Sequence, residues 1–195
     1  MNITVDTTAP GKPSIITTTS LTNDATPTIE GIAEAGSTVE LFNGSDSLGT
    51  TTADETTGAY TITPAELSDG DYSLTVTATD AAGNISAASD ALSMTVDATA
   101  PAQPAITTTT TLTSDATPTI EGTAEADSTV TLLSGGVAIG TTTANGDGQF
   151  SITTSTLADN TYSLTVTATD VAGNISDASD ALSLIHISEP TRPSI

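Results

Sequence analysis

The sequence predicts an all-β chain of two tandem β-sandwich domains, with about seven strands in each. One observation is a repeat, since VDTTAPGKPSI near the start returns as VDATAPAQPAI. The shift is 97 − 6 = 91 residues from Asp6 to Asp97, and 170 − 80 = 90 residues from Asp80 to Asp170 after one deletion. A second observation is that apolar and polar residues alternate with a period of two, without a helical period of about 3.6.

The repeat sets the expected domain organisation. Residues 1–96 form the first repeat, residues 97–184 the second, and residues 185–195 a tail outside the repeat. A unit of about 90 residues has the size of a small sandwich domain and buries a modest core. Both ends are expected to be cut from a longer protein, because the chain opens in the middle of the repeated motif.

The first four expected strands are short and are separated by turn residues. Ser14–Thr18 is the first, and Thr26–Ala33 is the second. Pro27 stands at the start of the second strand, where a missing N–H matters least. Thr38–Phe42, which reads TVELF, is the third strand, and Leu48–Thr52 is a short fourth.

The remaining three strands include the clearest one. Ala59–Ile62 is the fifth and precedes the turn signal SDGD. Tyr72–Thr79 reads YSLTVTAT and recurs as Tyr162–Thr169, with apolar residues on one face and serine or threonine on the other. This pattern is typical of a strand with one face in a core. Ala91–Val96 closes the unit, and seven short strands of this kind indicate an immunoglobulin-like sandwich.

Tyr72 and Tyr162 support that topology. Each stands at the start of the sixth strand, just after a turn, which is the position of a tyrosine corner. In a tyrosine corner the hydroxyl bonds back to the upstream backbone. The alternative is a partly buried tyrosine at a strand end.

Composition excludes several classes of partner. The chain has 24 acidic and two basic residues and a net charge of −22, whereas binding to nucleic acid or to an anionic membrane surface needs lysine and arginine. It has no cysteine, so disulfides and thiolate metal sites are excluded. No apolar run approaches the roughly 18 residues of a membrane span. Met1 is not followed by a basic and then an apolar region, so no signal peptide is visible.

Three motifs carry a family resemblance: D-x-T-A-P-x-x-P, D-A-T-P-T-I-E-G-x-A-E and Y-S-L-T-V-T-A-T-D-x-A-G-N-I-S. They resemble the bacterial immunoglobulin-like repeats of large surface adhesins and biofilm-associated proteins. The resemblance covers residues 4–184 and recurs in both repeats. It implies an extracellular rod on the bacterial cell surface, exported by type I secretion. It also implies neighbouring repeats of the same chain as partners, and calcium at the domain junctions.

The acidic residues suggest calcium independently, because Ca²⁺ takes six to eight oxygen ligands at about 2.3–2.6 Å. In the expected topology, the second repeat gathers five oxygen-bearing residues where the chain enters: Asp97, Glu125, Asp127, Asp170 and Asn174. The opposite end of the first repeat presents Asp24, Asp69 and Asp71. A partial equivalent at the start of the chain comprises Asp6, Glu34, Asp80 and Asn84.

Electrostatics favours a cation at such a junction. Two carboxylates 4 Å apart repel by roughly 4 kcal/mol at an effective dielectric constant near 20. Lys12 is the only basic residue in the two repeats. The alternative is that these residues only form turns, where aspartate and asparagine are common for local hydrogen-bonding reasons. Their spacing does not match an EF-hand loop.

No catalytic arrangement is evident, so the chain is not expected to be an enzyme. The repeats contain no histidine, which excludes a Ser-His-Asp arrangement within them. The glycines of SGGVAIG lack the lysine and helix of a phosphate loop and predict a hairpin turn. The Asn-Ile-Ser sequences at Asn84 and Asn174 fit a glycan acceptor by coincidence.

The repeat fails near the C-terminus. DALSMTVD of the first repeat becomes DALSLIHI, with the only histidine at position 186 and Ile187 in place of Asp97. Residues from about Leu184 to Ile195 resemble translated sequencing-adapter read-through, and the alternative is a natural divergent terminus. Either way, Leu184 and His186 stand where they would complete the last strand.

These observations predict a structural repeat segment of a bacterial adhesin, with a mechanical role and an unknown adhesive target. One alternative is a carbohydrate- or receptor-binding module, which would need an exposed aromatic platform. Another is a non-catalytic spacer in a secreted multidomain hydrolase.

Overall fold

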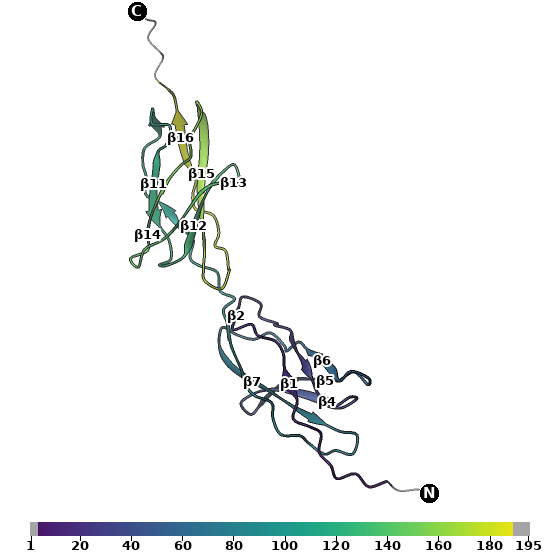
Figure 1. Cartoon of the computed structure of the whole chain (residues 1–195). Helices are drawn as coiled ribbons and strands as arrows, with labels where there is room; N and C mark the ends of the chain where they lie inside the picture. The colour runs from purple at the N-terminus through teal and green to yellow at the C-terminus, as the bar shows by residue number, and fades with distance from the viewer. Residues whose placement is uncertain (1–3, 189–195) are drawn as a thin grey trace, which may run out of the picture. The chain divides into compact units, whose positions relative to one another are not determined.

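The computed structural model describes residues 4–188 and divides the chain into two compact units. Unit one is Met1–Ala98 and unit two is Thr99–Ile195 (Figure 1). The division falls two residues beyond position 96, because Asp97 and Ala98 still donate backbone hydrogen bonds to Thr22 and Asp69 of unit one. The part of the predicted non-native tail from residue 189 to 195 lies outside the described residues.

Unit one is a sandwich of two sheets. The three-stranded sheet has the order β1-β3-β6, formed by Ser14–Ile15, Ile29–Ile32 and Ala59–Ile62. The five-stranded sheet has the order β2-β8-β7-β4-β5, formed by Leu21–Thr22, Leu92–Val96, Gly70–Thr79, Thr38–Asn43 and Asp46–Thr52. All pairings are antiparallel except that of β2 with β8.

Unit two repeats this architecture. Its three-stranded sheet has the order β14-β11-β9, formed by Gln149–Thr153, Thr119–Thr123 and Ala105–Ile106. Its five-stranded sheet has the order β10-β16-β15-β12-β13, formed by Leu112–Thr113, Leu182–His186, Asn160–Thr169, Thr129–Ser134 and Val137–Thr143. The described residues contain strands and no helix, which confirms the predicted all-β fold of two sandwiches.

Each unit has one strand more than expected. The extra strands, β2 and β10, are two residues long and too short to show alternation in the sequence. β6 has the predicted bounds, and β7 starts two residues before Tyr72. β1 and β3 are shorter than predicted, and β3 begins only after Pro27 and Thr28.

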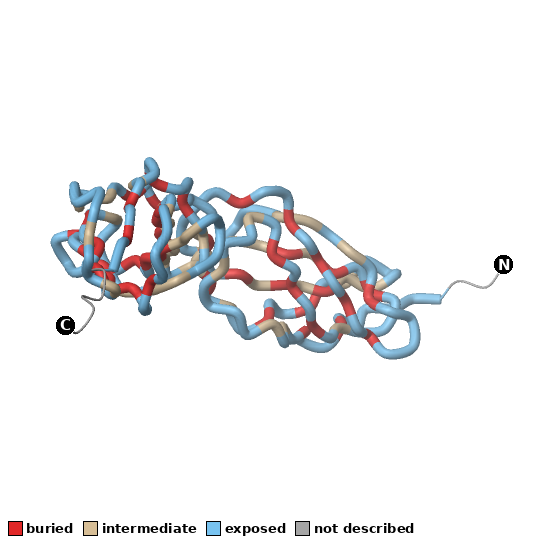
Figure 2. Tube along the Cα trace, turned by 90° about the horizontal axis from the view of Figure 1, so that it is seen from above, coloured by how far each residue is buried: buried red, intermediate tan, exposed pale blue. Residues whose placement is uncertain are grey.

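Alternation places one face of each long strand in the core. Buried and exposed residues alternate along the trace in Figure 2. In unit one Val39, Leu41, Leu74 and Val76 are fully buried, and the corresponding residues of unit two are buried equally. Each such aliphatic side chain contributes about 1.5–3 kcal/mol on burial. The core is therefore built from valine, leucine and isoleucine with few aromatic residues.

Both tyrosine corners are confirmed. The Tyr72 hydroxyl donates to the Ser68 carbonyl at 2.7 Å, and the Tyr162 hydroxyl donates to the Ala158 carbonyl at 3.0 Å. Each bond spans four residues upstream and fixes the turn before the long strand.

Buried serines that precede β8 continue the five-stranded sheet alongside β7. The Ala78 N–H donates to Ser86 Oγ at 2.9 Å, and the Ser86 N–H returns a bond to the Ala78 carbonyl. Ser176 and Ala168 repeat the arrangement in unit two. The serine of each Asn-Ile-Ser sequence thus has a structural role, because it satisfies a buried backbone donor that has no strand partner.

The end of β16 shows how the divergent sequence fits the fold. Leu184 pairs with Tyr162, as Met94 pairs with Tyr72, so the last strand is completed as expected. His186 takes the place of the fully buried Val96, and its side chain is 4% exposed. Its Nδ1 lies 3.2 Å from Asp159 Oδ1, but the geometry is not that of a hydrogen bond, and neither ring nitrogen has a hydrogen-bond partner.

Candidate metal centre

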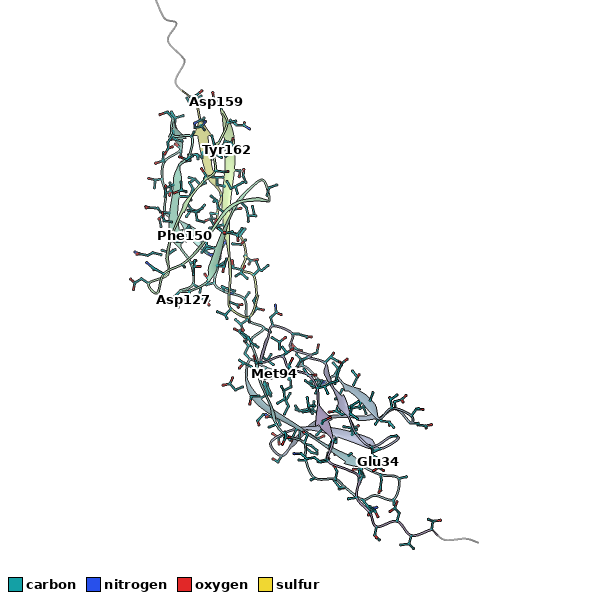
Figure 3. The ribbon with its side chains drawn as sticks, viewed as in Figure 1. Glu34, Met94, Asp127, Phe150, Asp159 and Tyr162 are labelled. Atoms are coloured by element: carbon teal, nitrogen blue, oxygen red, sulfur yellow. The ribbon has the colours of Figure 1, made fainter. Side chains whose placement is uncertain are left out.

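The predicted partial site of the first repeat lies at one end of unit one. Its three carboxylates line an open hollow of about 460 Å³, called here the acidic hollow. Asp6 comes from the segment before β1, Glu34 from the β3–β4 turn and Asp80 from the loop after β7. Figure 3 shows Glu34 at the end of unit one where the N-terminal segment enters. The structure therefore brings together three carboxylates that are far apart in the sequence.

Asp80 accepts more hydrogen bonds than the other two carboxylates of the acidic hollow. Its Oδ1 accepts hydrogen bonds from the backbone N–H groups of Ala82 and Asn84, both at 2.9 Å, and its Oδ2 accepts one from Asn84 Nδ2 at 2.8 Å. The Asn84 side-chain bond is the largest contribution to a lowered Asp80 pKa. Asn84 Nδ2 also donates to the Asp6 carbonyl at 3.3 Å, which links the two segments.

Unit two repeats the aspartate–asparagine pair. Asp170 Oδ1 accepts from the backbone of Gly173 at 2.7 Å and of Asn174 at 2.8 Å, and Asn174 Nδ2 donates to Oδ2 at 2.8 Å. Burial acts to raise the Asp170 pKa, but the hydrogen bonds from Asn174 and Gly173 outweigh it and lower the pKa. Both loops therefore hold an ionised carboxylate at neutral pH.

The acidic side chains do not converge on a common point where a metal ion could bind. Among residues 4–188, no group of three or more histidine, aspartate or glutamate side chains is arranged to hold a metal ion. Asp6 Oδ1 accepts a bond from the Thr8 N–H at 3.0 Å, which is a turn interaction. The acidic hollow is thus lined by oxygen atoms that could bind calcium, but these atoms do not surround one point.

The three predicted residues at the opposite end of unit one each accept a hydrogen bond within that unit. Asp24 Oδ1 accepts from the N–H and the hydroxyl of Thr26 at 2.8 and 3.0 Å. Asp69 Oδ1 accepts from the Ala98 N–H at 2.7 Å, and Asp71 Oδ1 accepts from the Thr95 hydroxyl at 2.6 Å. The turn interpretation therefore accounts for Asp24, whereas Asp69 and Asp71 bind segments that are distant in the sequence.

The other predicted ligands of unit two lie in the β11–β12 turn. The Glu125 carbonyl accepts two bonds from Ser128, one from its N–H and one from its hydroxyl. Asp127, labelled in Figure 3, has a φ of 63°, where Gly36 of unit one has 73°. Asp97 belongs to unit one, and its N–H donates to the Thr22 carbonyl at 2.9 Å.

The glycine-rich segment of unit two is a hairpin turn, as predicted. Gly135 and Gly136 connect β12 to β13 with φ values of 56° and 84°. Backbone in this region is adopted readily by glycine and at a cost by other residues. The buried serines that extend the sheet were not predicted, although their Ser-x-x-Ser spacing recurs in both repeats.

Comparison with known proteins identifies the fold and the family. The family described as Bacterial Ig-like domain matches residues 2–98 and again residues 102–185. The chain belongs to the bacterial Ig-like domain family. Ig-like domains of this kind are generally non-catalytic modules. The described residues contain no helix that is long and apolar enough to cross a membrane.

Individual relatives are more distant. The chain is similar to Chitinase A1 of Niallia circulans, with 32% identity over 98% of this chain and 28% of that protein. It is also similar to the fibronectin(III)-like modules of Clostridium thermocellum CbhA, with 17% identity, a TM-score of 0.57 and coverage of 94% of this chain and 98% of that one. A biofilm-associated protein BSP domain matches with 21% identity and a TM-score of 0.38, over 93% of this chain and 30% of that one.

Proposed function

We propose that the chain is a structural repeat segment of a bacterial cell-surface adhesin, which holds a terminal binding domain away from the cell. The observation that carries the proposal is that the two units repeat both their strands and their aspartate-to-backbone hydrogen bonds, at Asp80 and Asp170 and at Asp69 and Asp159. Such tandem copies are typical of rods, whereas a catalytic centre gains little from copying in series. Neighbouring Ig-like repeats of the same protein are its proposed partners, and the location is extracellular.

The second part of the proposal is calcium at the N-terminal end of each unit, where it stiffens the rod. The acidic hollow supports it, since Asp6, Glu34 and Asp80 line one open surface. No lysine or arginine lines the acidic hollow to offset the three carboxylates. A divalent cation would remove that repulsion, and the flexible Glu34 side chain is the ligand with the largest reach.

Calcium titration with small-angle scattering tests this proposal. We expect calcium to raise the melting temperature of the chain. We also expect it to increase the maximum dimension from scattering or to narrow the distribution of that dimension, and a chelator to reverse these effects. Asp80→Asn should weaken calcium binding at unit one, while Asp46→Asn, an exposed carboxylate of β5, should leave it unchanged. Identical scattering and identical melting with calcium and with chelator would rule out calcium stiffening.

A spacer in a secreted multidomain hydrolase is the second candidate. It is favoured by the 32% identity to a chitinase, of which the match spans 28% of the length. The source gene separates the two candidates, because an adjoining catalytic domain favours the spacer and many further copies of the unit favour the adhesin.

A carbohydrate- or receptor-binding module finds less support. All five aromatic side chains are buried or half-buried: Phe42, Tyr60, Tyr72, Phe150 and Tyr162. Phe150 and Tyr60 belong to the two cores, so they offer no platform for stacking against a sugar ring.

A further inference from the structure

The C-terminal end of each unit carries the same hydrogen bond between a side chain and the departing main chain. Asp69 Oδ1 accepts from the Ala98 N–H, and Asp159 Oδ1 accepts from the Ser188 N–H, both at 2.7 Å and both across 29 residues. Figure 3 shows Asp159 where the chain leaves unit two. The bond therefore recurs just beyond the last strand of each unit.

Strand register explains why this aspartate reaches the chain. Gly70 pairs with Val96 across β7 and β8, so the residue before Gly70 lies beside the residues after Val96. A second bond holds the same segment, since the Asp97 N–H donates to the Thr22 carbonyl at 2.9 Å. Two consecutive backbone donors beyond the last strand are thus tied to unit one.

The comparison of the two units shows that the bond does not depend on the residue it holds. Ser188 replaces Ala98, and Ile187 replaces Asp97, yet the acceptor and its 2.7 Å distance are the same. The donor is a backbone N–H, which every residue except proline supplies. In unit two the Ser188 hydroxyl adds a further bond to Asp159 Oδ2 at 2.7 Å.

The segment that follows Ala98 contains two prolines. Pro101 and Pro104 come three and six residues after Ala98, and each fixes its own φ. Between them, Gln103 Nε2 donates to the Ala178 carbonyl of unit two at 2.6 Å, as Lys12 contacts Asp90 in unit one at 2.7 Å. With Ala98 fixed, few free backbone dihedrals remain before the chain is held again.

We propose that Asp69 and Asp159 are positioning residues that fix the direction in which the linker leaves each unit, and that they stiffen the tandem array without a metal ion. The inference rests on the proposed role of the chain as a rod segment. It differs from calcium stiffening because the holding group is a carboxylate bound to the main chain of its own unit. Charge-assisted hydrogen bonds of this kind are shorter and stronger than neutral ones.

Amide hydrogen exchange of the full chain in the presence of a chelator tests the bond itself. Asp69→Ala should speed exchange at the Ala98 N–H by roughly tenfold, which corresponds to the loss of one such bond. Asp69→Asn keeps an oxygen acceptor and should retain part of the protection. Glu55→Ala removes the same charge from an exposed turn and should leave Ala98 unchanged.

Exchange at the buried Val76 amide reports whether unit one remains folded in each variant. Should Asp69→Ala fail to fold, Asp159→Ala and the Ser188 amide provide the same measurement in unit two. Unchanged exchange of Ala98 in a folded Asp69→Ala variant, or of Ser188 in a folded Asp159→Ala variant, overturns the inference.

Distance measurement between spin labels tests the mechanical consequence. The chain has no cysteine, so Asp46→Cys and Val137→Cys place labels at equivalent exposed hairpin positions of the two units. In chelator, we expect a narrow distance distribution that Asp69→Ala broadens and Glu55→Ala does not.

The outcomes separate this inference from the proposed calcium function. A distribution that is broad in chelator and narrow in calcium overturns the inference and supports calcium stiffening. A distribution that stays narrow in Asp69→Ala also overturns the inference. A parent chain that is broad with and without calcium contradicts both proposals.

Discussion

Ser89 and Val76 are joined by two hydrogen bonds. The Val76 N–H donates to Ser89 Oγ at 3.0 Å, and the Ser89 N–H donates to the Val76 carbonyl at 2.9 Å. The pair acts as one rung of a strand ladder, although Ser89 lies in an irregular loop. The hydroxyl takes the place of the carbonyl that a regular neighbouring strand would supply.

Removing that hydroxyl should destabilise unit one. Ser89→Ala leaves the fully buried Val76 backbone donor unsatisfied, which costs about 1–3 kcal/mol of unfolding free energy. Denaturant unfolding measures this change, and Ser179→Ala should lower the stability of unit two similarly. Ser45→Ala, in an exposed turn, is the control and should be neutral. Equal stability of Ser89→Ala and Ser45→Ala would contradict the assigned role.

Gly31 is expected to be intolerant of any side chain. It pairs with Tyr60 across β3 and β6, and a Cβ at this position would collide with the Ser14 carbonyl and the Tyr60 ring. Because one obstacle is backbone, Gly31→Ala should displace β1 and cost at least the 1–3 kcal/mol of an overpacked core. Gly11→Ala meets nothing within 4 Å and serves as the control. Thermal unfolding of the two variants should differ clearly, and equal melting temperatures would refute the predicted clash.

The sequence predicted the parts of the fold that rest on alternation. β6 has the expected bounds because Tyr60 and Ile62 alternate with exposed residues along four consecutive positions. β2 escaped prediction because two residues carry no period, and its parallel pairing with β8 depends on tertiary structure.

Some features of the candidate site were predicted from the sequence and others were not. Asp6, Glu34 and Asp80 were predicted to meet because topology alone places their loops at one end of the sandwich. The bond of Asp69 to Ala98 was not predicted, because its donor is a backbone N–H and leaves no mark in the sequence. The hydroxyl of Ser89 was equally hidden, since a serine in a loop is ordinarily a turn residue.

Asp127 is the one described non-glycine residue with a positive φ, and we expect this conformation to lower the stability of unit two. Its φ of 63° matches that of Gly36 in unit one, where glycine adopts the conformation without strain. Asp127→Gly should therefore stabilise unit two by about 1 kcal/mol, and Gly36→Asp should destabilise unit one by a similar amount. Chemical denaturation measures both. A stabilising Gly36→Asp variant would show that this turn favours aspartate for another reason.

His186 predicts a local weakness in unit two. It occupies the position of Val96, where the side chain is buried and neither ring nitrogen is hydrogen-bonded. His186→Val should raise the stability of unit two by about 1–3 kcal/mol, because it removes unsatisfied buried polar atoms. The reciprocal Val96→His should lower the stability of unit one. If both substitutions are neutral in calorimetry, the histidine is accommodated without cost.

Asp80 predicts a pH dependence of unit one. Hydrogen bonds, chiefly from the Asn84 side chain, lower its folded pKa below the ordinary value of 3.8. The unfolded chain therefore binds its proton first as the pH falls, and stability rises with pH in this window. The contribution of the carboxylate is fully present above the unfolded pKa and is lost as the pH drops through the lowered folded pKa.

The stability difference between the parent chain and Asp80→Asn isolates this effect from the other acidic residues. We expect a constant difference above about pH 5, which shrinks progressively below pH 3.8. Urea unfolding at a series of pH values measures it. Asp46→Asn, which removes an exposed carboxylate of β5, is the matched control. A difference that stays the same down to pH 2 would mean that the Asn84 and backbone bonds do not favour the ionised form.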